Sequence, residues 1–320
     1  MGKTTSLSYQ ITSAVDSCTT SGESKRDYKQ KHGGDTDWHV FGFEYKNELC
    51  QTGKDLGRFL HENYPDLKYI RDTTPEMVQK FVDHKSETCN NKTLEKIYSN
   101  LHKLDKIIEH KYKDSIGTRY VSVPESKTGK EDIKTKIIGD ADYKRLLESV
   151  GEDSPAGRSL KLSHSCGLRL EETVCVKMDR FEPTGGRWGF GTLNILAGDG
   201  SKGNRPRIID IPSSDARREV LEAVEGRQPG QLIVAKADGS QYEKKSITRT
   251  ISRHMDKLEI GSEYKQNKNH SLRKAFAQAC YDLCREKGMS KKDSLGYVNR
   301  QLGHSENRSD LSAVYVKYQW

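Results

Sequence analysis

The chain has 320 residues, and its 54 Lys and Arg against 46 Asp and Glu give a formal net charge of +8 at neutral pH. This length suits two domains, and apolar residues recur too regularly for wholesale disorder, although only 33% of residues are hydrophobic and 31% are charged. No run of 18 apolar residues occurs and the first residues lack the pattern of a signal peptide, so we expect neither a membrane span nor secretion.

The seven cysteines stand at wide spacings, which predicts reduced thiols and a cytoplasmic protein. The positive charge is spread unevenly along the chain. Residues 1–120 hold 19 Lys and Arg against 18 Asp and Glu, whereas residues 121–320 hold 35 against 28. Such a bias fits a nucleic-acid partner, but many ordinary enzymes are equally basic. Charge alone therefore leaves the partner open.

Residues 1–35 predict a short amphipathic helix followed by a polar linker. Leu7, Ile11 and Val15 recur at helical spacing, and four basic residues between positions 25 and 31 follow them. A solvated linker explains the basic cluster, and we favour this interpretation. The alternative is a basic arm that touches phosphates.

Residues 36–118 are expected to form a compact all-helical domain of about four helices. Thr74 and Pro75 predict a helix start, because Thr caps helices and Pro suits their first position. The apolar positions at helical spacing are Phe59, Leu60, Tyr64, Met77, Phe81, Val82, Leu94, Ile97, Leu101, Leu104 and Ile108.

Residues 119–320 are expected to form a second domain, since residues 112–135 are polar and break the helical period. Helices are predicted around residues 139–150 and 154–166. Two β-leaning runs then flank a cluster of Gly, Asp and Asn at residues 198–204, which predicts a β-hairpin. The expected fold class is therefore mainly α with a small β-hairpin or sheet.

Two arginines stand at predicted helix starts in this second domain. Arg169 follows Gly167 at a glycine-to-helix junction, and Glu172 comes one turn later. His270 and Arg273 lie three residues apart at the start of another helix, so their side chains can converge. The free N–H groups and the positive dipole end of such a helix suit a phosphate. Taken alone, this pair is better explained by a capping His and a solvated Arg.

The last motifs lie near the end of the sequence. Gly303 ends a predicted short helix, and His304 follows in the turn. Tyr315 stands eleven residues after His304, and Tyr318 lies about one helical turn further on.

The ordered set of Gly-Leu-Arg-Leu-Glu-Glu, a basic hairpin, His-Ser-Leu-Arg, Leu-Gly-His and a late Tyr resembles the phage-integrase type of tyrosine recombinase. The motifs cover roughly residues 120–320, and residues 36–118 match the family's helical core-binding (SAM-like) DNA-binding domain in position and character. The resemblance implies a mixed α+β catalytic domain at residues 119–320. It also implies site-specific cutting and rejoining of DNA through a covalent 3′-phosphotyrosine, without metal, ATP or another cofactor.

The resemblance also implies a role for each matching residue. Arg169 and Arg273 would clamp the phosphate, Lys202 on the hairpin would protonate the leaving 5′-oxygen, and Glu172 would orient a catalytic group. The position of Lys202 also suits an exposed turn lysine that contacts DNA phosphate without taking part in catalysis. The catalytic set by resemblance is Arg169, Lys202, His270, Arg273, His304 and Tyr315.

The nucleophile is expected to be Tyr315 rather than Tyr318. Its distance from His304 is nearer the family's usual spacing, although a couple of residues longer, and the preceding residues give the expected apolar context. DNA contacts are further expected from Arg205, Arg207 and Lys274. The stretch Phe181–Phe190 is interpreted as an insertion, because it lengthens the segment between Arg169 and Lys202.

The expected partners are double-stranded DNA with specific recombination sites, further copies of the chain (a tetramer on DNA) and accessory DNA-bending proteins. A bacterial, phage or mobile-element origin and a cytoplasmic, nucleoid-associated location are expected. Two alternatives stay open. A type IB topoisomerase nicks and reseals with a similar set of residues, and a DNA-binding regulator could keep the fold without cleaving DNA.

Overall fold

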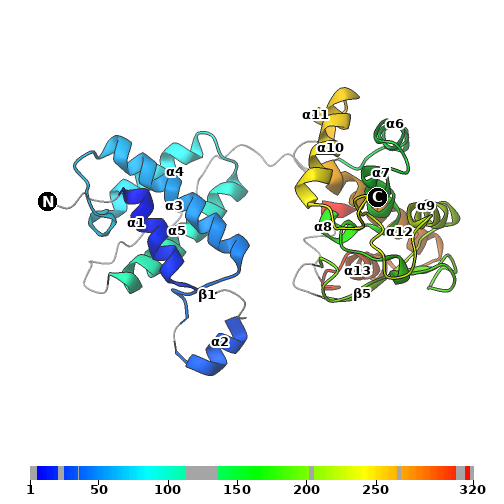
Figure 1. Cartoon of the computed structure of the whole chain (residues 1–320), viewed down its shortest axis with the longest axis horizontal. Coiled ribbons are helices and arrows are strands. Elements are labelled where there is room, and N and C mark those ends of the chain that lie inside the picture. The colour runs from blue at the N-terminus through cyan, green and yellow to red at the C-terminus, as the bar shows by residue number, and fades with distance from the viewer. Residues whose placement is uncertain are drawn as a thin grey trace. The chain divides into compact units, whose positions relative to one another are not determined.

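The computed structural model divides into two compact units, Met1–Asp132 and Ile133–Trp320 (Figure 1). It describes residues 6–20, 25–34, 36–112, 136–201, 205–264, 268–307 and 314–317, without the side chains of Arg26 and Lys268. Each unit has its own cluster of buried apolar side chains.

The first unit is a bundle of helices around one core, with a short pair of strands, β1 and β2, that the prediction of an all-helical domain did not include. Helix α4 begins as predicted, with Pro75 in its first turn and the Thr74 hydroxyl accepting a hydrogen bond from the Met77 backbone N–H at 3.4 Å. The elements are α1 (Leu7–Ser17), β1 (Thr19–Thr20), α2 (Lys25–His32), β2 (Val40–Phe41), α3 (Phe43–Asn63), the 3₁₀ turn η1 (Ile70–Asp72), α4 (Pro75–Ser86) and α5 (Asn91–Lys111).

Helix α1 belongs to this core rather than to a linker. The amphipathic helix that the sequence predicts is present, but its apolar face (Leu7, Ile11, Ala14, Val15) is fully buried against α3 and α5. A second helix, α2, occupies part of the expected polar linker. The assignment of residues 1–35 to a separate segment thus differs from the structure, because burying the apolar stripe of α1 stabilises the unit that follows it.

The second unit is mainly helical with a small antiparallel sheet, which confirms the predicted fold class. The helices expected near residues 139–150 and 154–166 are α6 and α7. The elements are α6 (Asp140–Val150), α7 (Pro155–Cys166), α8 (Leu170–Thr173), the 3₁₀ turn η2 (Met178–Arg180), β3 (Phe181–Glu182), β4 (Thr192–Ile195), β5 (Arg207–Asp210), α9 (Ser214–Val224), α10 (Lys244–Lys257), α11 (Gly261–Tyr264), α12 (Lys268–Glu286) and α13 (Lys291–Gln301).

The sheet has the strand order β3-β4-β5, with Thr192 opposite Asp210 and Ile195 opposite Arg207 in the hairpin. Strand β3 falls inside the stretch interpreted as an insertion. That stretch is part of the fold, because β3 pairs with β4 and the Trp188 indole N–H donates to the Tyr297 hydroxyl at 2.7 Å.

Helix α7 is the central element of the second unit. Nine of its twelve residues are buried, and it packs against α9 and α12. It ends at Gly167, which takes the left-handed conformation at φ 60° and ψ 27°. A Cβ at this position would clash with the ring of Phe276 on α12. Glycine here lets the chain turn sharply and delivers Arg169 to the middle of the unit.

Among the described residues, no helix combines the length and the apolar character that crossing a bilayer requires.

The close contact between α1 and α3 can be tested at Gly57. A Cβ there would lie 2.6 Å from the Ser8 backbone nitrogen, so Gly57→Ala must push α1 away from α3. We expect the free energy of unfolding of the first unit to fall by about 1–3 kcal/mol in chemical denaturation. Gly296→Ala on α13 is the control, because its nearest new contact is 3.9 Å away. Equal stability of the two variants would contradict the described packing.

Candidate active site

The site is organised around one buried carboxylate, that of Glu172 on α8. Arg169 is the residue that caps this helix, and its backbone N–H donates to Glu172 Oε2 at 2.8 Å. The Arg169 guanidinium reaches the other carboxylate oxygen, Oε1, at 3.1 Å. The Glu172 side chain is 0% exposed, whereas that of Arg169 is 24% exposed. Arg169 therefore lies at the boundary with solvent, and its contacts with the buried Glu172 carboxylate fix its position.

Arg207 on β5 binds the same carboxylate. Its two terminal nitrogens meet the two oxygens of Glu172 at 2.7 Å each, and its Nε donates to the Gln301 carbonyl at 3.1 Å. The sequence prediction placed Arg207 on DNA. The structure instead holds it as a 7% exposed partner of Glu172, because a buried carboxylate needs a bidentate cation to offset its desolvation.

The Arg207 contact also sets the charge state of Glu172. Burial alone would raise the pKa of this carboxyl, but the hydrogen bonds and the charge of Arg207, together with the Arg169 N–H, hold the pKa below its ordinary value. The carboxylate therefore stays ionised at neutral pH.

Arg273 on α12 is almost completely buried, with 2% of its surface exposed. Its terminal nitrogens donate to the backbone carbonyls of Gly167 and Leu302, which lie at the C-terminal ends of α7 and α13. Such carbonyls lack partners inside their own helices and carry the negative end of the helix dipole, so they suit a buried cation. The Leu302 carbonyl also accepts from Arg169 at 3.3 Å.

The burial of Arg273 and its proximity to Arg169 affect the acidity of Arg273. Burial, and then the positive charge of Arg169, lowers the pKa of Arg273 to about 10. The Arg273 guanidinium is still protonated at neutral pH. The positive charges of Arg169 and Arg273 therefore lie close together. The Arg273 Nε is buried without a hydrogen-bond partner among the described residues.

Two histidines and one tyrosine complete this cluster. The Tyr315 ring lies with its centroid 4.9 Å from that of His270 and 5.6 Å from that of His304, and the Arg273 guanidinium carbon lies 5.7 Å from the ring centre. Tyr315 is 6% exposed. The structure thus brings five of the sequence-predicted residues together: Arg169, His270, Arg273, His304 and Tyr315.

His270 stands in the first turn of α12 beside the two arginines. Burial, followed by the charges of Arg273, Lys274 and Arg169, lowers its pKa to about 4. Its imidazole is therefore neutral at pH 7 and has a nitrogen lone pair to accept a proton.

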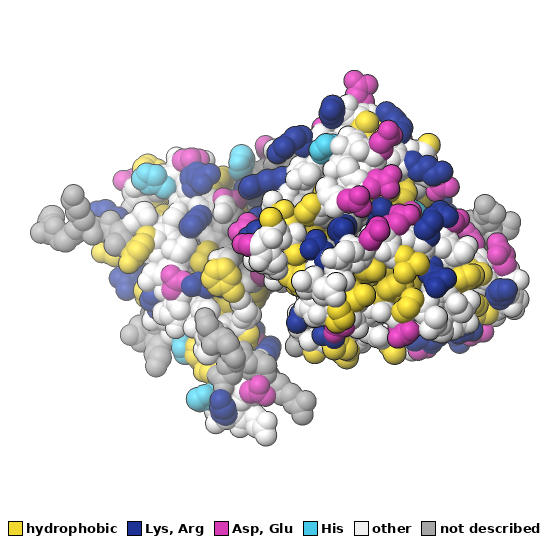
Figure 2. Space-filling view, turned by 45° about the vertical axis from the view of Figure 1, so that its right-hand side comes forward, with side chains coloured by type: hydrophobic (Ala, Val, Ile, Leu, Met, Phe, Trp, Pro, Cys, Tyr) yellow, Lys and Arg dark blue, Asp and Glu magenta, His cyan; other side chains and the backbone are white. Residues whose placement is uncertain are grey.

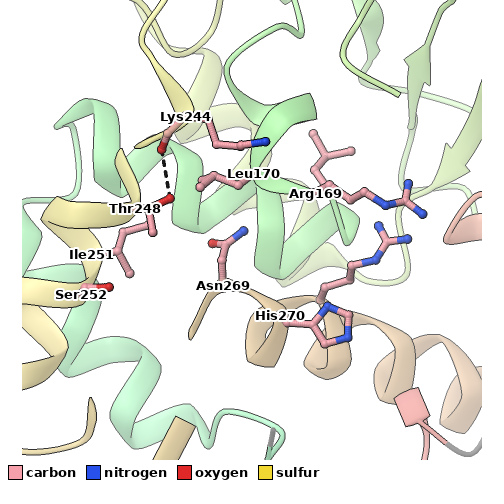
Figure 3. A pocket seen from close by; sticks show the side chains of 10 residues that line it. Arg169, Leu170, Lys244, Thr248, Ile251, Ser252, Asn269 and His270 are labelled. Carbon is pink, nitrogen blue, oxygen red and sulfur yellow. Dashed lines mark hydrogen bonds between the residues drawn. The ribbon is translucent and has the colours of Figure 1, made fainter. Parts of the chain in front are cut away.

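A cavity of about 280 Å³ lies beside this cluster (Figure 3). Arg169 and His270 line one side of it, and Lys244, Thr248 and Ser252 of α10 line the other. Arg273 is a further lining residue. The three α10 residues recur every four positions, so they share one helix face. These three residues were not among the site residues predicted from the sequence, although their spacing within a basic helix was a signal that could have identified them.

The other predicted residues have different positions. Lys202 and Tyr318 lie outside the described residues. Arg205 is exposed, as a DNA contact would be. Lys274 is 5% exposed, so its side chain is buried in the unit and does not match the predicted surface contact.

Across the described parts of the chain, no three His, Cys, Asp or Glu side chains converge in a way that could hold a metal ion. The cations that line the described cavity are the guanidinium groups of Arg169 and Arg273 and the ammonium group of Lys244, which pairs with the Glu171 carboxylate.

The family model for Integrase matches residues 126–279. Similar solved structures are XerH site-specific recombinase bound to palindromic difH substrate (TM-score 0.62, 15% identity, 87% of this chain and 77% of that chain), a lambda integrase tetramer bound to a Holliday junction (0.64, 15%, 96% and 78%) and the Tn1549 transposon integrase in complex with a circular intermediate DNA (0.58, 12%, 97% and 96%). No curated protein sequence gives a significant match. At these identities the likeness establishes that the fold is that of the tyrosine recombinases.

The ion pair of Arg207 with Glu172 can be tested against its exposed neighbour Arg205. Arg207→Gln leaves a buried carboxylate without its bidentate partner, so the free energy of unfolding of the second unit should fall by about 3–5 kcal/mol. Arg205→Gln should change it by no more than about 0.5 kcal/mol. Both values come from denaturant unfolding at neutral pH. A similar small effect in both variants would refute the role of Arg207 described above.

The lowered pKa of His270 predicts a pH dependence of stability. Between pH 6.5 and about 4 the unfolded chain protonates this imidazole while the folded chain does not, so stability falls as the pH falls through this window. The contribution is up to about 3 kcal/mol. His270→Asn should remove it, which denaturation at several pH values can measure. Parallel curves for variant and wild type across this window would contradict the assignment.

Proposed function

We propose, from the premise that the second unit of this chain is an integrase-type tyrosine recombinase domain, that the protein cuts and rejoins DNA strands at specific sites. The observation that carries the proposal is the convergence of two arginines, two histidines and Tyr315 beside one cavity. A protein that only bound DNA would not need this geometry.

The substrate would be a phosphodiester, and attack on it builds negative charge on its non-bridging oxygens. Arg169 and Arg273 are placed to meet this charge, since guanidinium forks bind phosphate oxygens in pairs and stay protonated at neutral pH. The N-terminus of α12 adds its dipole at the same place. Stabilising the developing charge in this way is the main contribution that we assign to the arginines.

The Tyr315 hydroxyl would attack phosphorus, forming a bond between its oxygen and the 3′-phosphate. Its proton would pass to His270, which is neutral and adjacent. The bond from phosphorus to the 5′-oxygen breaks, and Lys202 would protonate this oxygen. The covalent phosphotyrosine keeps the energy of the broken bond, so rejoining to another 5′-hydroxyl reverses the same steps without ATP.

DNA binding by the second unit is supported by α10. Beyond the residues in the cavity, this helix carries Lys245, Arg249 and Arg253 four positions apart on an exposed face. Figure 2 shows basic and acidic side chains interspersed over the visible surface, so net charge alone does not locate the contact. A local row of three cations next to the catalytic cavity is the stronger argument.

The remaining parts of the proposal concern assembly. We propose that the first unit is the core-binding domain and that copies of the chain act together on DNA, up to a tetramer. We further propose that accessory DNA-bending proteins assist and that the reaction takes place in the cytoplasm at the nucleoid. The structural relatives bound to DNA, one of them a tetramer, support the DNA partner and the oligomer.

A nicked suicide substrate that carries a candidate attachment site tests this function. Cleavage next to the nick releases a short strand and traps the covalent protein–DNA adduct, which denaturing electrophoresis resolves. We expect the adduct with wild type and with Tyr318→Phe, and its loss with Tyr315→Phe, which lacks the attacking oxygen. An adduct that persists in Tyr315→Phe would disprove the nucleophile assignment.

The same assay separates the alternatives. A topoisomerase would relax supercoiled plasmid regardless of the site, whereas we expect adduct formation to depend on it. A regulator without cleavage activity would bind the substrate and form no adduct. The absence of an adduct with wild type on every candidate site would therefore contradict the proposed function.

A further inference from the structure

Helix α2 is the most basic short segment of the first unit. Its eight residues carry four Lys and Arg against one Asp, a net charge of +3. Residues 1–112 as a whole hold 17 Lys and Arg against 17 Asp and Glu. The other residues of this stretch are therefore net negative, and its positive charge is concentrated in α2.

This helix contributes little to the core. Among its described side chains, Tyr28 is half-buried and the others are exposed. An eight-residue helix is unstable by itself in water, so contacts at its base must hold it in place. Figure 1 shows α2 set apart from the bundle formed by α1, α3, α4 and α5.

The base of α2 is a compact aromatic and strand contact. The Tyr28 ring stacks on His39 with 4.2 Å between centroids and meets Phe41 edge-on at 5.4 Å. Strands β1 and β2 pair in parallel, with Thr19 opposite Val40, and thus bring the two ends of the α2 excursion together.

Lys103 on α5 fixes the second strand end. It is bonded to the carbonyls of Asp37 at 2.5 Å and His39 at 2.7 Å, while Lys106 pairs with the Asp37 carboxylate at 2.7 Å. Because its base is tied to α5 in this way, α2 presents its charges from a defined position. A solvated linker needs no such anchoring.

We propose that α2 is a second DNA-contacting element, which binds the sugar–phosphate backbone of duplex DNA through Lys25, Lys29 and Lys31. The identity of the partner rests on the proposed function, since the same chain is then an enzyme of duplex DNA. Lys25 and Lys29 lie four residues apart and share a helix face, so both can approach one strand. The contact is to phosphate, so it adds affinity and orientation without reading sequence.

The test measures binding of the full chain to a fluorescein-labelled duplex of random sequence by fluorescence anisotropy. The salt dependence is followed between about 50 and 200 mM KCl. In the triple variant Lys25→Gln, Lys29→Gln, Lys31→Gln, the slope of log K against log salt should become shallower by about 2–3, because each lost phosphate contact removes about 0.9. Binding at low salt should weaken at the same time.

The matched control is Lys54→Gln, Lys68→Gln, Lys80→Gln. These lysines are exposed on the same unit, so the net charge changes equally while α2 is intact. We expect the control to keep the wild-type slope. An unchanged slope in the α2 variant, or an equal change in both variants, would overturn the proposal.

A second readout separates this inference from the proposed function. At saturating protein, the α2 variant should form the covalent adduct on the suicide substrate at the wild-type rate, because it leaves the second unit unchanged. Failure of the wild type to form any adduct would refute the proposed function while the salt slopes still tested α2. A loss of adduct in the α2 variant at saturation would overturn a role confined to binding.

Discussion

The second unit depends on a balance of charge around one buried carboxylate. Three guanidinium groups, those of Arg169, Arg207 and Arg273, lie close together and would repel one another if Glu172 were absent. Arg207 takes both oxygens of Glu172, so Arg169 makes weaker contact with it and keeps part of its surface toward solvent. Arg207 is thus a structural cation, because Glu172 engages it fully. Arg169 is a candidate substrate-binding cation, because Glu172 engages it only in part.

Much of the fold was predictable, because the apolar periodicity and the capping residues that indicate a helix are local features of the sequence. Thr74 caps α4 as expected, and β4 pairs antiparallel with β5, as the predicted hairpin requires. The core membership of α1 was not predictable in the same way. An apolar stripe indicates that one face of a helix is buried, but not which other element it packs against. The predicted linker boundary at residue 35 therefore differs from the structure, in which α1 belongs to the core of the first unit.

The candidate site shows the same division between local and distant information. Motif order predicted the residues that gather near Tyr315, and the structure places five of them together. Motif order could not predict the role of Arg207. An arginine beside a predicted hairpin turn has the same sequence signature whether it pairs with DNA or with a buried acid. Only the register of β5 against α8 and α13 decides between them, and that register is a property of the whole fold.

The two arginines of the candidate phosphate clamp share one acceptor, the backbone carbonyl of Leu302. A main-chain oxygen is present whatever side chain occupies the position, so point substitution cannot delete it. The geometry of the clamp is instead coupled to the length of α13, since one added or removed residue would turn the end of this helix by about 100°. A substitution at position 302 leaves this acceptor in place, although the Leu302 side chain is itself buried in the core, whereas an insertion or deletion in α13 would displace the acceptor.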